Sequence, residues 1–143
     1  MFKKYFILFF LLGLFSTTLH AQNKAEQAIR EVLAEQTQAW NEGKITDFMK
    51  GYWNSPNLIF VSKNGLRYGY DSTLKNYLKH YPTTKESGIL KFELFQVKKL
   101  SSKYYLVLGS WHIHRAIGDV QGCFSLLFKK IKGEWNIVID HSS

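Results

Sequence analysis

The sequence predicts an α+β fold in which three N-terminal helices pack on a curved antiparallel sheet. Residues 103–115 form a β-rich run that is too long for a loop. Similar runs precede it at 90–98 and follow it at 122–131 and 134–141. The short turns between them are expected at Ser101-Ser102, Gly118-Asp119 and Lys132-Gly133. Strands joined by short turns form an antiparallel meander. In the part before residue 83, apolar residues recur at helical spacing, which predicts helices that cover the sheet.

The run at 103–115 is the predicted centre of the sheet. Side chains alternate along a strand, so its residues separate into two faces. One face carries Tyr105, Val107, Gly109, Trp111 and Ile113. The other carries Tyr104, Leu106, Leu108, Ser110, His112 and His114. Because both faces are largely apolar in the first half, we expect a strand that is covered on both sides.

Three segments are predicted to be helical. Apolar residues at three- and four-residue steps mark the first at 23–40, and Gly43 is suited to a left-handed cap after it. A shorter second helix is expected at 46–53. The third, at 72–81, has Asp71 placed as its N-cap. The helices therefore make up most of the first half of the chain.

A β-hairpin is expected between the second and third helices. Residues 58–62 form a short β run, and Asn64-Gly65 is a strong signal for a tight hairpin turn. Residues 66–68 would return against the first strand. Residues 83–88 are polar and are expected to link the third helix to the meander.

Residues 1–21 are expected to be a signal peptide. Lys3 and Lys4 precede an apolar run at 5–15, which is short for a membrane span. Small and polar residues follow, so we expect cleavage before Gln22. The alternative is an N-terminal membrane anchor that is never cleaved. Cleavage predicts an exported protein, periplasmic or extracellular, with no stable membrane insertion.

The mature chain, 22–143, has the size of one domain with one core. It keeps 17 of the 19 basic residues and all 11 acidic ones, which gives a net charge of +6. Its lysines are scattered rather than gathered in a run, so we expect a solvated surface and no nucleic-acid partner. Cys123 is the single cysteine, so no intramolecular disulfide is possible. We expect it to be buried in a strand.

Several short motifs, in their order and spacing, resemble the nuclear transport factor 2-like superfamily, and within it the SnoaL-like domains of unknown function found in secreted bacterial proteins. The resemblance covers nearly all of 22–143. It implies a cystatin-like cone with a central pocket, usually a homodimer through the sheet, and no single activity. The motifs are Ala39-Trp40-Asn41-Glu42-Gly43 with Asp47-Phe48, the strand 57–62, Gly69-Tyr70-Asp71, Gly109 with Trp111, and the closing segment 133–143.

The ketosteroid isomerases of this superfamily pair an acid on the strand after the second helix with a tyrosine from the first helix. Such a pair supplies a base and a donor for the enolate oxygen. The strand at 58–62 holds no acid here, and residues 25–40 hold no tyrosine. Isomerase chemistry by that route is therefore not expected, and whether the protein is an enzyme stays open.

The predicted catalytic candidates are His141 and Asp140, on the last strand. We expect His141 to share the packed face of Trp135, Ile137 and Ile139, where it would be a general base because its ordinary pKa lies near neutrality. The alternative is a structural histidine with its hydrogen bonds satisfied. Asp140, the neighbouring residue, would then point to the opposite face.

His112 and His114 have a spacing that suits metal ligands on one strand face. A third ligand would be needed, and His141 or Asp140 on the last strand could supply it. The alternative is two polar residues at a strand end. We expect no metal to be bound tightly enough to stay with protein purified without added metal, and no cofactor.

Aromatic residues are expected to line one pocket between the helices and the sheet, and Arg67 is a candidate anchor for an anionic ligand. The predicted ligand-binding residues are Trp40, Tyr52, Phe60, Arg67, Tyr70 and Trp111. Three functions remain open: an exported homodimer that binds a small, largely apolar molecule; an enzyme that uses His141, with Asp140 or His112, for proton transfer; and a structural dimer whose aromatics fill its own pocket.

The homodimer is expected to form through the second face of the sheet. Three helices cover only one face, so the other would be left bare. The residues expected at this interface are Tyr104, Leu106 and Leu108, with Phe95, Val97 and Leu127 from the neighbouring strands.

Overall fold

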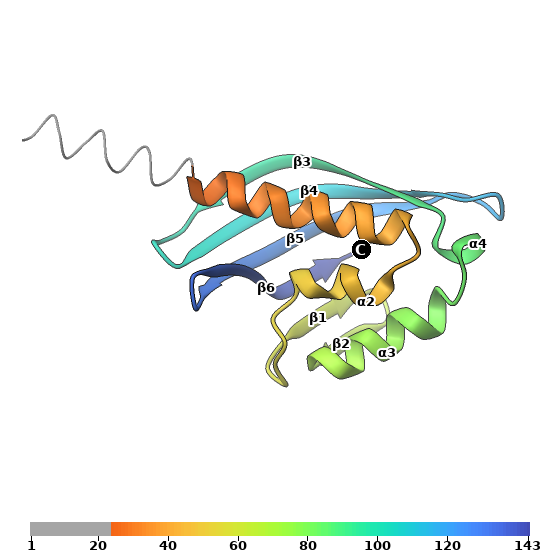
Figure 1. Ribbon diagram of the computed structural model, residues 1–143, viewed down its shortest axis with the longest axis horizontal. Helices are drawn as coiled ribbons and strands as arrows, with labels where there is room; N and C mark the ends of the chain where they lie inside the picture. Colours follow the sequence, from red (N-terminus) through yellow and green to blue (C-terminus); the bar gives the residue numbers. More distant parts are fainter. Residues whose placement is uncertain (1–23) are drawn as a thin grey trace, which may run out of the picture.

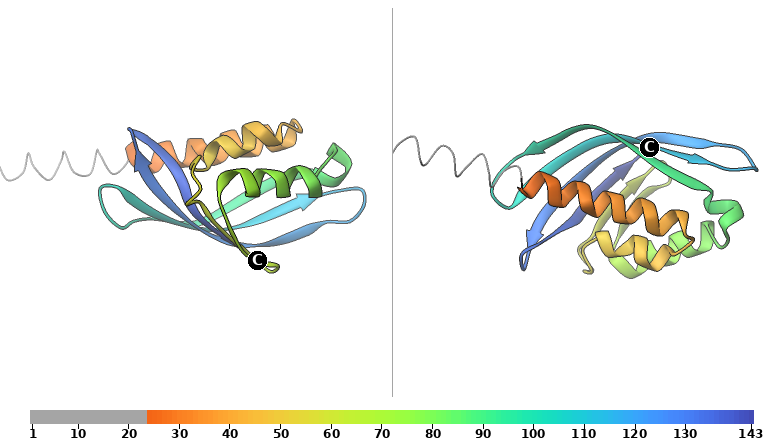
Figure 2. Two further views of the ribbon diagram at one scale, coloured as in Figure 1. Left: turned by 90° about the horizontal axis from the view of Figure 1, so that it is seen from below. Right: turned by 45° about the horizontal axis from the view of Figure 1, so that its top comes forward.

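The computed structural model describes residues 24–143, which form one curved six-stranded sheet with the helices on one side (Figures 1 and 2). This confirms the predicted α+β fold. The predicted signal peptide and its cleavage site before Gln22 lie outside the described residues. None of the helices within 24–143 has the length and apolar character that crossing a membrane requires.

The meander is present as the sequence predicted it. Its turns lie where they were expected, at Ser101-Ser102, near Gly118-Asp119 and at Lys132-Gly133. Its four strands are β3 (Ile89–Lys99), β4 (Tyr104–His114), β5 (Val120–Ile131) and β6 (Glu134–Ser142), paired antiparallel in this order.

The remaining two strands, β1 (Ile59–Ser62) and β2 (Gly65–Tyr68), form the expected hairpin. The hairpin joins the sheet through a parallel pairing of β1 with β6, which gives the strand order β2-β1-β6-β5-β4-β3. The sequence did not predict this pairing. It places Phe60 directly beside Asp140.

The N-terminal helix spans residues 24–41 and is the orange helix of Figure 1. The second predicted helix, 46–53, is shorter than expected. It consists of α2 (Ile45–Phe48) and the 3₁₀ turn η1 (Met49–Gly51), after which Tyr52 is extended.

The buried amide of Gln36 explains this early end. Its Nε2 donates to the carbonyl oxygen of Phe48 at 3.0 Å, the acceptor that the next α-helical turn would use. The amide of Tyr52 instead donates to the carbonyl of Met49, at 2.9 Å.

The third helix, α3 (Tyr70–His80), begins earlier than predicted, and Asp71 lies in its first turn rather than at its N-cap. Gly69 holds the N-cap position with a φ of 91°, a left-handed value that favours glycine. A further short helix, α4 (Thr84–Ser87), lies where a linker was expected. Its N-cap is Thr83, whose hydroxyl accepts from the amide of Lys85.

The helices cover one face of the sheet and leave the other face open in the single chain. On β4, the face carrying Tyr105, Val107 and Ile113 is buried under the helices. On the opposite face Leu106 and Leu108 are only half-buried, because the described helices all lie on one side of the sheet (Figure 2). The expectation that this strand is covered on both sides is therefore wrong for the single chain.

Candidate functional site

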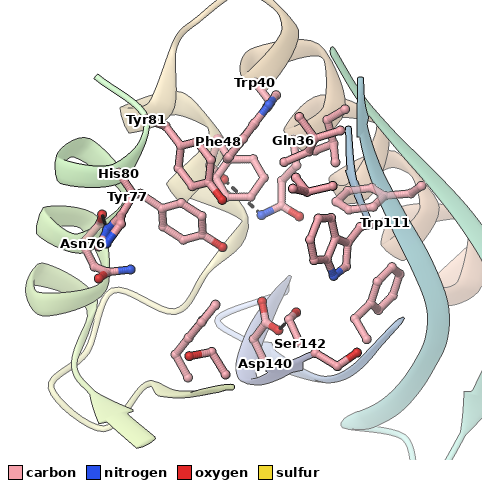
Figure 3. Close-up of a pocket in the computed structure, with 18 of the residues that line it drawn as sticks. Gln36, Trp40, Phe48, Asn76, Tyr77, His80, Tyr81, Trp111, Asp140 and Ser142 are labelled. Atoms are coloured by element: carbon pink, nitrogen blue, oxygen red, sulfur yellow. Dashed lines mark hydrogen bonds between the residues drawn. The ribbon is translucent and has the colours of Figure 1, made fainter. Parts of the chain in front are cut away.

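A cavity of about 580 Å³ lies between the helices and the inner face of the sheet (Figure 3). Its volume is in the range of small-molecule sites. The wall is mostly aromatic and aliphatic, with a few polar side chains. The helical side supplies Gln36, Trp40, Phe48, Asn76, Tyr77, His80 and Tyr81, and the sheet supplies Phe60, Leu90, Phe92, Trp111, Ile113, Phe124, Leu126, Asp140 and Ser142.

Asp140 is the acidic residue of this wall, and it is buried, with 3% of its surface exposed. The hydroxyl of Tyr52 donates to its Oδ2 at 2.6 Å, and the hydroxyl of Ser142 donates to its Oδ1 at 2.6 Å. Burial raises the pKa of Asp140 to about 6, although both hydrogen bonds favour the ionised form. The carboxyl group therefore titrates close to neutral pH.

Two tyrosines extend this polar group into the cavity. The hydroxyl oxygens of Tyr52 and Tyr77 lie 3.5 Å apart. Burial raises the pKa of the Tyr52 and Tyr77 phenols above the ordinary value. The negative charge of nearby Asp140 raises both pKa values further. Both hydroxyls therefore stay protonated at neutral pH and remain able to donate hydrogen bonds.

The prediction that His141 shares the packed face of β6 is wrong. The register between β5 and β6 shifts at Leu127/Phe128, where the two strands are irregular. Beyond this point alternate residues change face, so Asp140 lies inside with Ile137 and His141 is exposed on the outer side. The general-base role predicted for His141 depended on the inner face, whereas Asp140 is the residue that reaches the cavity.

Four of the six predicted ligand-binding residues line the cavity: Trp40, Tyr52, Phe60 and Trp111. The other two, Arg67 and Tyr70, do not. The Nη2 of Arg67 donates to Oδ1 of Asn76, a residue of the wall, at 2.9 Å.

The sequence reasoning missed Tyr77, Gln36 and Ser142 as cavity residues. Tyr77 belongs to the apolar positions of its helix, and Ser142 is the last residue of β6, beyond the irregularity that changes the phase of this strand. Gln36 lies on the apolar side of the first helix. A polar amide at such a position was the one local signal that could have indicated a cavity residue.

Two buried polar groups within the described residues have no hydrogen-bond partner: the indole nitrogen of Trp111 and the hydroxyl of Tyr105. Trp111 forms part of the cavity wall (Figure 3). Buried donors are normally satisfied, so this indole N–H, whose nitrogen is shielded from solvent in the structure, lacks the partner that such a group usually has.

His112 and His114 lie away from the cavity, at the far end of β4. The pairing of β5 puts His112 beside Gln121 and His141 beside Ser125, four residues further along. This separation is about 13 Å along the strand. Neither His141 nor the inward-facing Asp140 is therefore placed as their third ligand.

The chain is similar to several solved structures. A nuclear transport factor 2-like protein of unknown function from Shewanella oneidensis MR-1 is 38% identical, with 82% of this chain and 97% of that chain covered and a TM-score of 0.79. A cystatin-like domain of unknown function from Nostoc punctiforme PCC 73102 is 19% identical, with 82% and 75% covered and a TM-score of 0.70.

A ketosteroid isomerase-like protein from Erwinia carotovora atroseptica SCRI1043 is 15% identical. The match covers 85% of this chain and 96% of that chain, with a TM-score of 0.67. At this identity the likeness concerns the fold. No family model and no curated protein matches the chain.

Proposed function

The chain belongs to the nuclear transport factor 2-like superfamily, as its motifs predicted, and we propose that it binds a small, largely apolar molecule in the cavity beneath its helices. One observation carries the proposal: an aromatic cavity of about 580 Å³ closes on a single buried carboxyl group, Asp140. Pockets for small organic molecules combine such apolar walls with few polar groups, which fix the orientation of the ligand.

The polar groups define the chemistry of the ligand. Asp140 is already bonded to Tyr52 and Ser142, while the indole N–H of Trp111 has no partner. A ligand with a hydrocarbon body and one carbonyl or hydroxyl oxygen would satisfy this donor and meet the carboxyl group. Small cyclic ketones, lactones and hydrophobic alcohols fit this description.

The test is ligand-observed NMR with a panel of these three compound classes, repeated on a variant with a smaller cavity. Val120 lines the cavity at a half-exposed position, so Val120→Trp fills it. Leu78 is exposed on α3 outside the cavity, so Leu78→Trp adds the same side chain elsewhere. We expect binding to wild type and Leu78→Trp, and at least tenfold weaker binding to Val120→Trp. Equal binding by all three proteins would contradict the proposal.

A second candidate function is proton transfer by Asp140, and the raised pKa of about 6 favours it. A base works best when its pKa lies near the working pH. The earlier alternative used His141 as the base, but His141 is exposed on the outer side of the sheet and does not line the cavity. The test is deuterium incorporation at the α-carbon of bound ketones or lactones in D₂O. We expect a rate that rises through pH 6 and levels off above it, absent in Asp140→Asn. An equal rate in Asp140→Asn would exclude Asp140 as the base.

Export and dimerisation complete the proposal. The charged start, apolar run and small residues within 1–21 support a cleaved signal peptide. The half-buried Leu106 and Leu108, on the side without helices, support a homodimer through the sheet.

A further inference from the structure

A cluster of three potential metal ligands lies at the far end of β4, outside the cavity. His112 Nε2 is 3.1 Å and His114 Nδ1 is 2.8 Å from the same oxygen, Oδ2 of Asp119. The three ligand atoms all lie within 4.8 Å of one another. The cluster is on the β4–β5 hairpin, at the right of Figure 1.

The local fold explains this meeting. His112 and His114 are two residues apart on β4, so their rings project from the same face. The following turn brings Asp119 back beside them, with Gly118 at a φ of 110°, which favours glycine. The amide of Arg115 donates to Oδ1 of Asp119 at 3.0 Å. This bond fixes the carboxylate and leaves Oδ2 facing the histidines.

We propose that His112, His114 and Asp119 bind a divalent transition-metal ion of the zinc type. Two imidazoles and a carboxylate are a common ligand set for Zn²⁺. Tetrahedral Zn²⁺ with bonds of about 2.1 Å holds its ligands roughly 3.4 Å apart. The carboxylate already lies near this distance from both rings. Small rotations of the exposed histidine rings would bring the third ligand pair together.

The charges around the cluster set its affinity. The carboxylate of Asp119 supplies the negative charge of the cluster and already contacts both imidazoles. Lys91 lies opposite His112 on β3 and adds a repelling positive charge. The guanidinium of Arg115 donates through Nε to the carbonyl of Gly118 at 2.7 Å.

The three side chains are exposed and a lysine lies beside one of them, so the site should bind the ion reversibly. This agrees with the expectation that no metal stays with protein purified without added metal. The fourth position would remain open to water or to a donor from another molecule, as in zinc sites that are not purely structural. The third ligand is Asp119, which the sequence reasoning did not consider.

Calorimetric titration of tag-free protein with ZnCl₂ at pH 7.5 tests the site. We expect one ion per chain in the wild type and at least tenfold weaker binding in His112→Asn, His114→Asn and Asp119→Asn. The matched controls are His80→Asn and His141→Asn, since both histidines lie outside the cluster. They should bind within twofold of wild type.

A second measurement separates a lost site from lost folding. Zn²⁺ should raise the melting temperature of the wild type and of both control variants, because an ion that binds only the folded state stabilises it. It should leave the melting temperatures of the three cluster variants unchanged. No saturable binding by the wild type, or an equal loss in His80→Asn or His141→Asn, would overturn the proposal.

Discussion

Ionising the buried carboxyl group of Asp140 destabilises the fold, and the effect can be measured as a change in the free energy of unfolding. Its pKa rises from an ordinary 3.8 to about 6, first because of burial. Between about pH 4 and pH 6 the folded state therefore binds more protons than the unfolded state, and the free energy of unfolding falls as the pH rises. Two pKa units correspond to about 3 kcal/mol, and above pH 6 the loss is complete.

We therefore expect Asp140→Asn to be free of this loss. Denaturant unfolding at pH 4 and pH 7.5 should show a smaller decrease in the variant than in the wild type, by up to about 3 kcal/mol. Asparagine keeps a carbonyl oxygen that can accept from Tyr52, so the fold should be retained. Parallel pH profiles for the two proteins would mean that Asp140 titrates normally in the folded state.

The 3₁₀ turn η1 packs closely against the N-terminal helix, with Gly51 against the side chain of Gln36. A Cβ atom added at Gly51 would lie 2.7 Å from both Cδ and Nε2 of Gln36. Gln36 is 2% exposed and bonded to the carbonyl of Phe48, so it has little freedom to move. We expect Gly51→Ala to destabilise the protein by about 1–3 kcal/mol, the usual cost of overpacking.

A double-mutant cycle identifies the cause of that effect. Gln36→Ala removes the clashing amide, so adding Gly51→Ala to it should cost clearly less than Gly51→Ala alone in chemical denaturation. If the two substitutions are additive, the destabilisation arises from the backbone of η1 and not from contact with Gln36.

How far the sequence predicted each element depended on how local its signals are. Turns such as Lys132-Gly133 and the alternation along β4 follow from neighbouring residues, and both were predicted correctly. The parallel pairing of β1 with β6 joins Phe60 to Asp140, 80 positions apart, and no local pattern encodes it. The irregularity at Leu127/Phe128 reverses the phase of β6, so simple alternation assigned His141 to the wrong face.

The N-terminal segment 1–21 predicts export of the whole protein. If residues 1–21 are a signal peptide, mass spectrometry of the mature protein should find its N-terminus at or near Gln22. The protein should be recovered from the periplasm or the medium. A chain that retains Met1 in the membrane fraction would instead support the uncleaved anchor.

The outer face of the sheet carries the prediction of a homodimer. Register pairing aligns one outward row across five strands, composed of Tyr68, Ile59, Ile139, Leu127 and Leu106. The row agrees with the expected placement of Leu106 and Leu127. Val97 was assigned to this face, but it pairs with Val107 and packs against the core on the inner side. The interface we propose is therefore shifted toward β6 and β1.

This row continues into large apolar side chains that are open to solvent in the single chain. Tyr68 is 60% exposed, Leu66 is 56% exposed and Phe95, at the bulge in β3, is 59% exposed. An apolar face of this kind is uncommon on a soluble monomer. Burying it against the same face of a second copy produces a twofold interface, aromatic and aliphatic at its centre.

Leu106→Asp tests this interface, because it would bury an unpaired charge between the two sheets. We expect the wild type to sediment as a dimer at micromolar concentration and Leu106→Asp to sediment as a monomer. Leu78→Asp, on the exposed side of α3, is the matched control and should remain a dimer. Circular dichroism separates dissociation from unfolding, since Leu106 faces away from the helices and the folded monomer should keep its spectrum. A wild-type protein of monomer mass would mean that the outer face of the sheet is not an interface between copies of this chain.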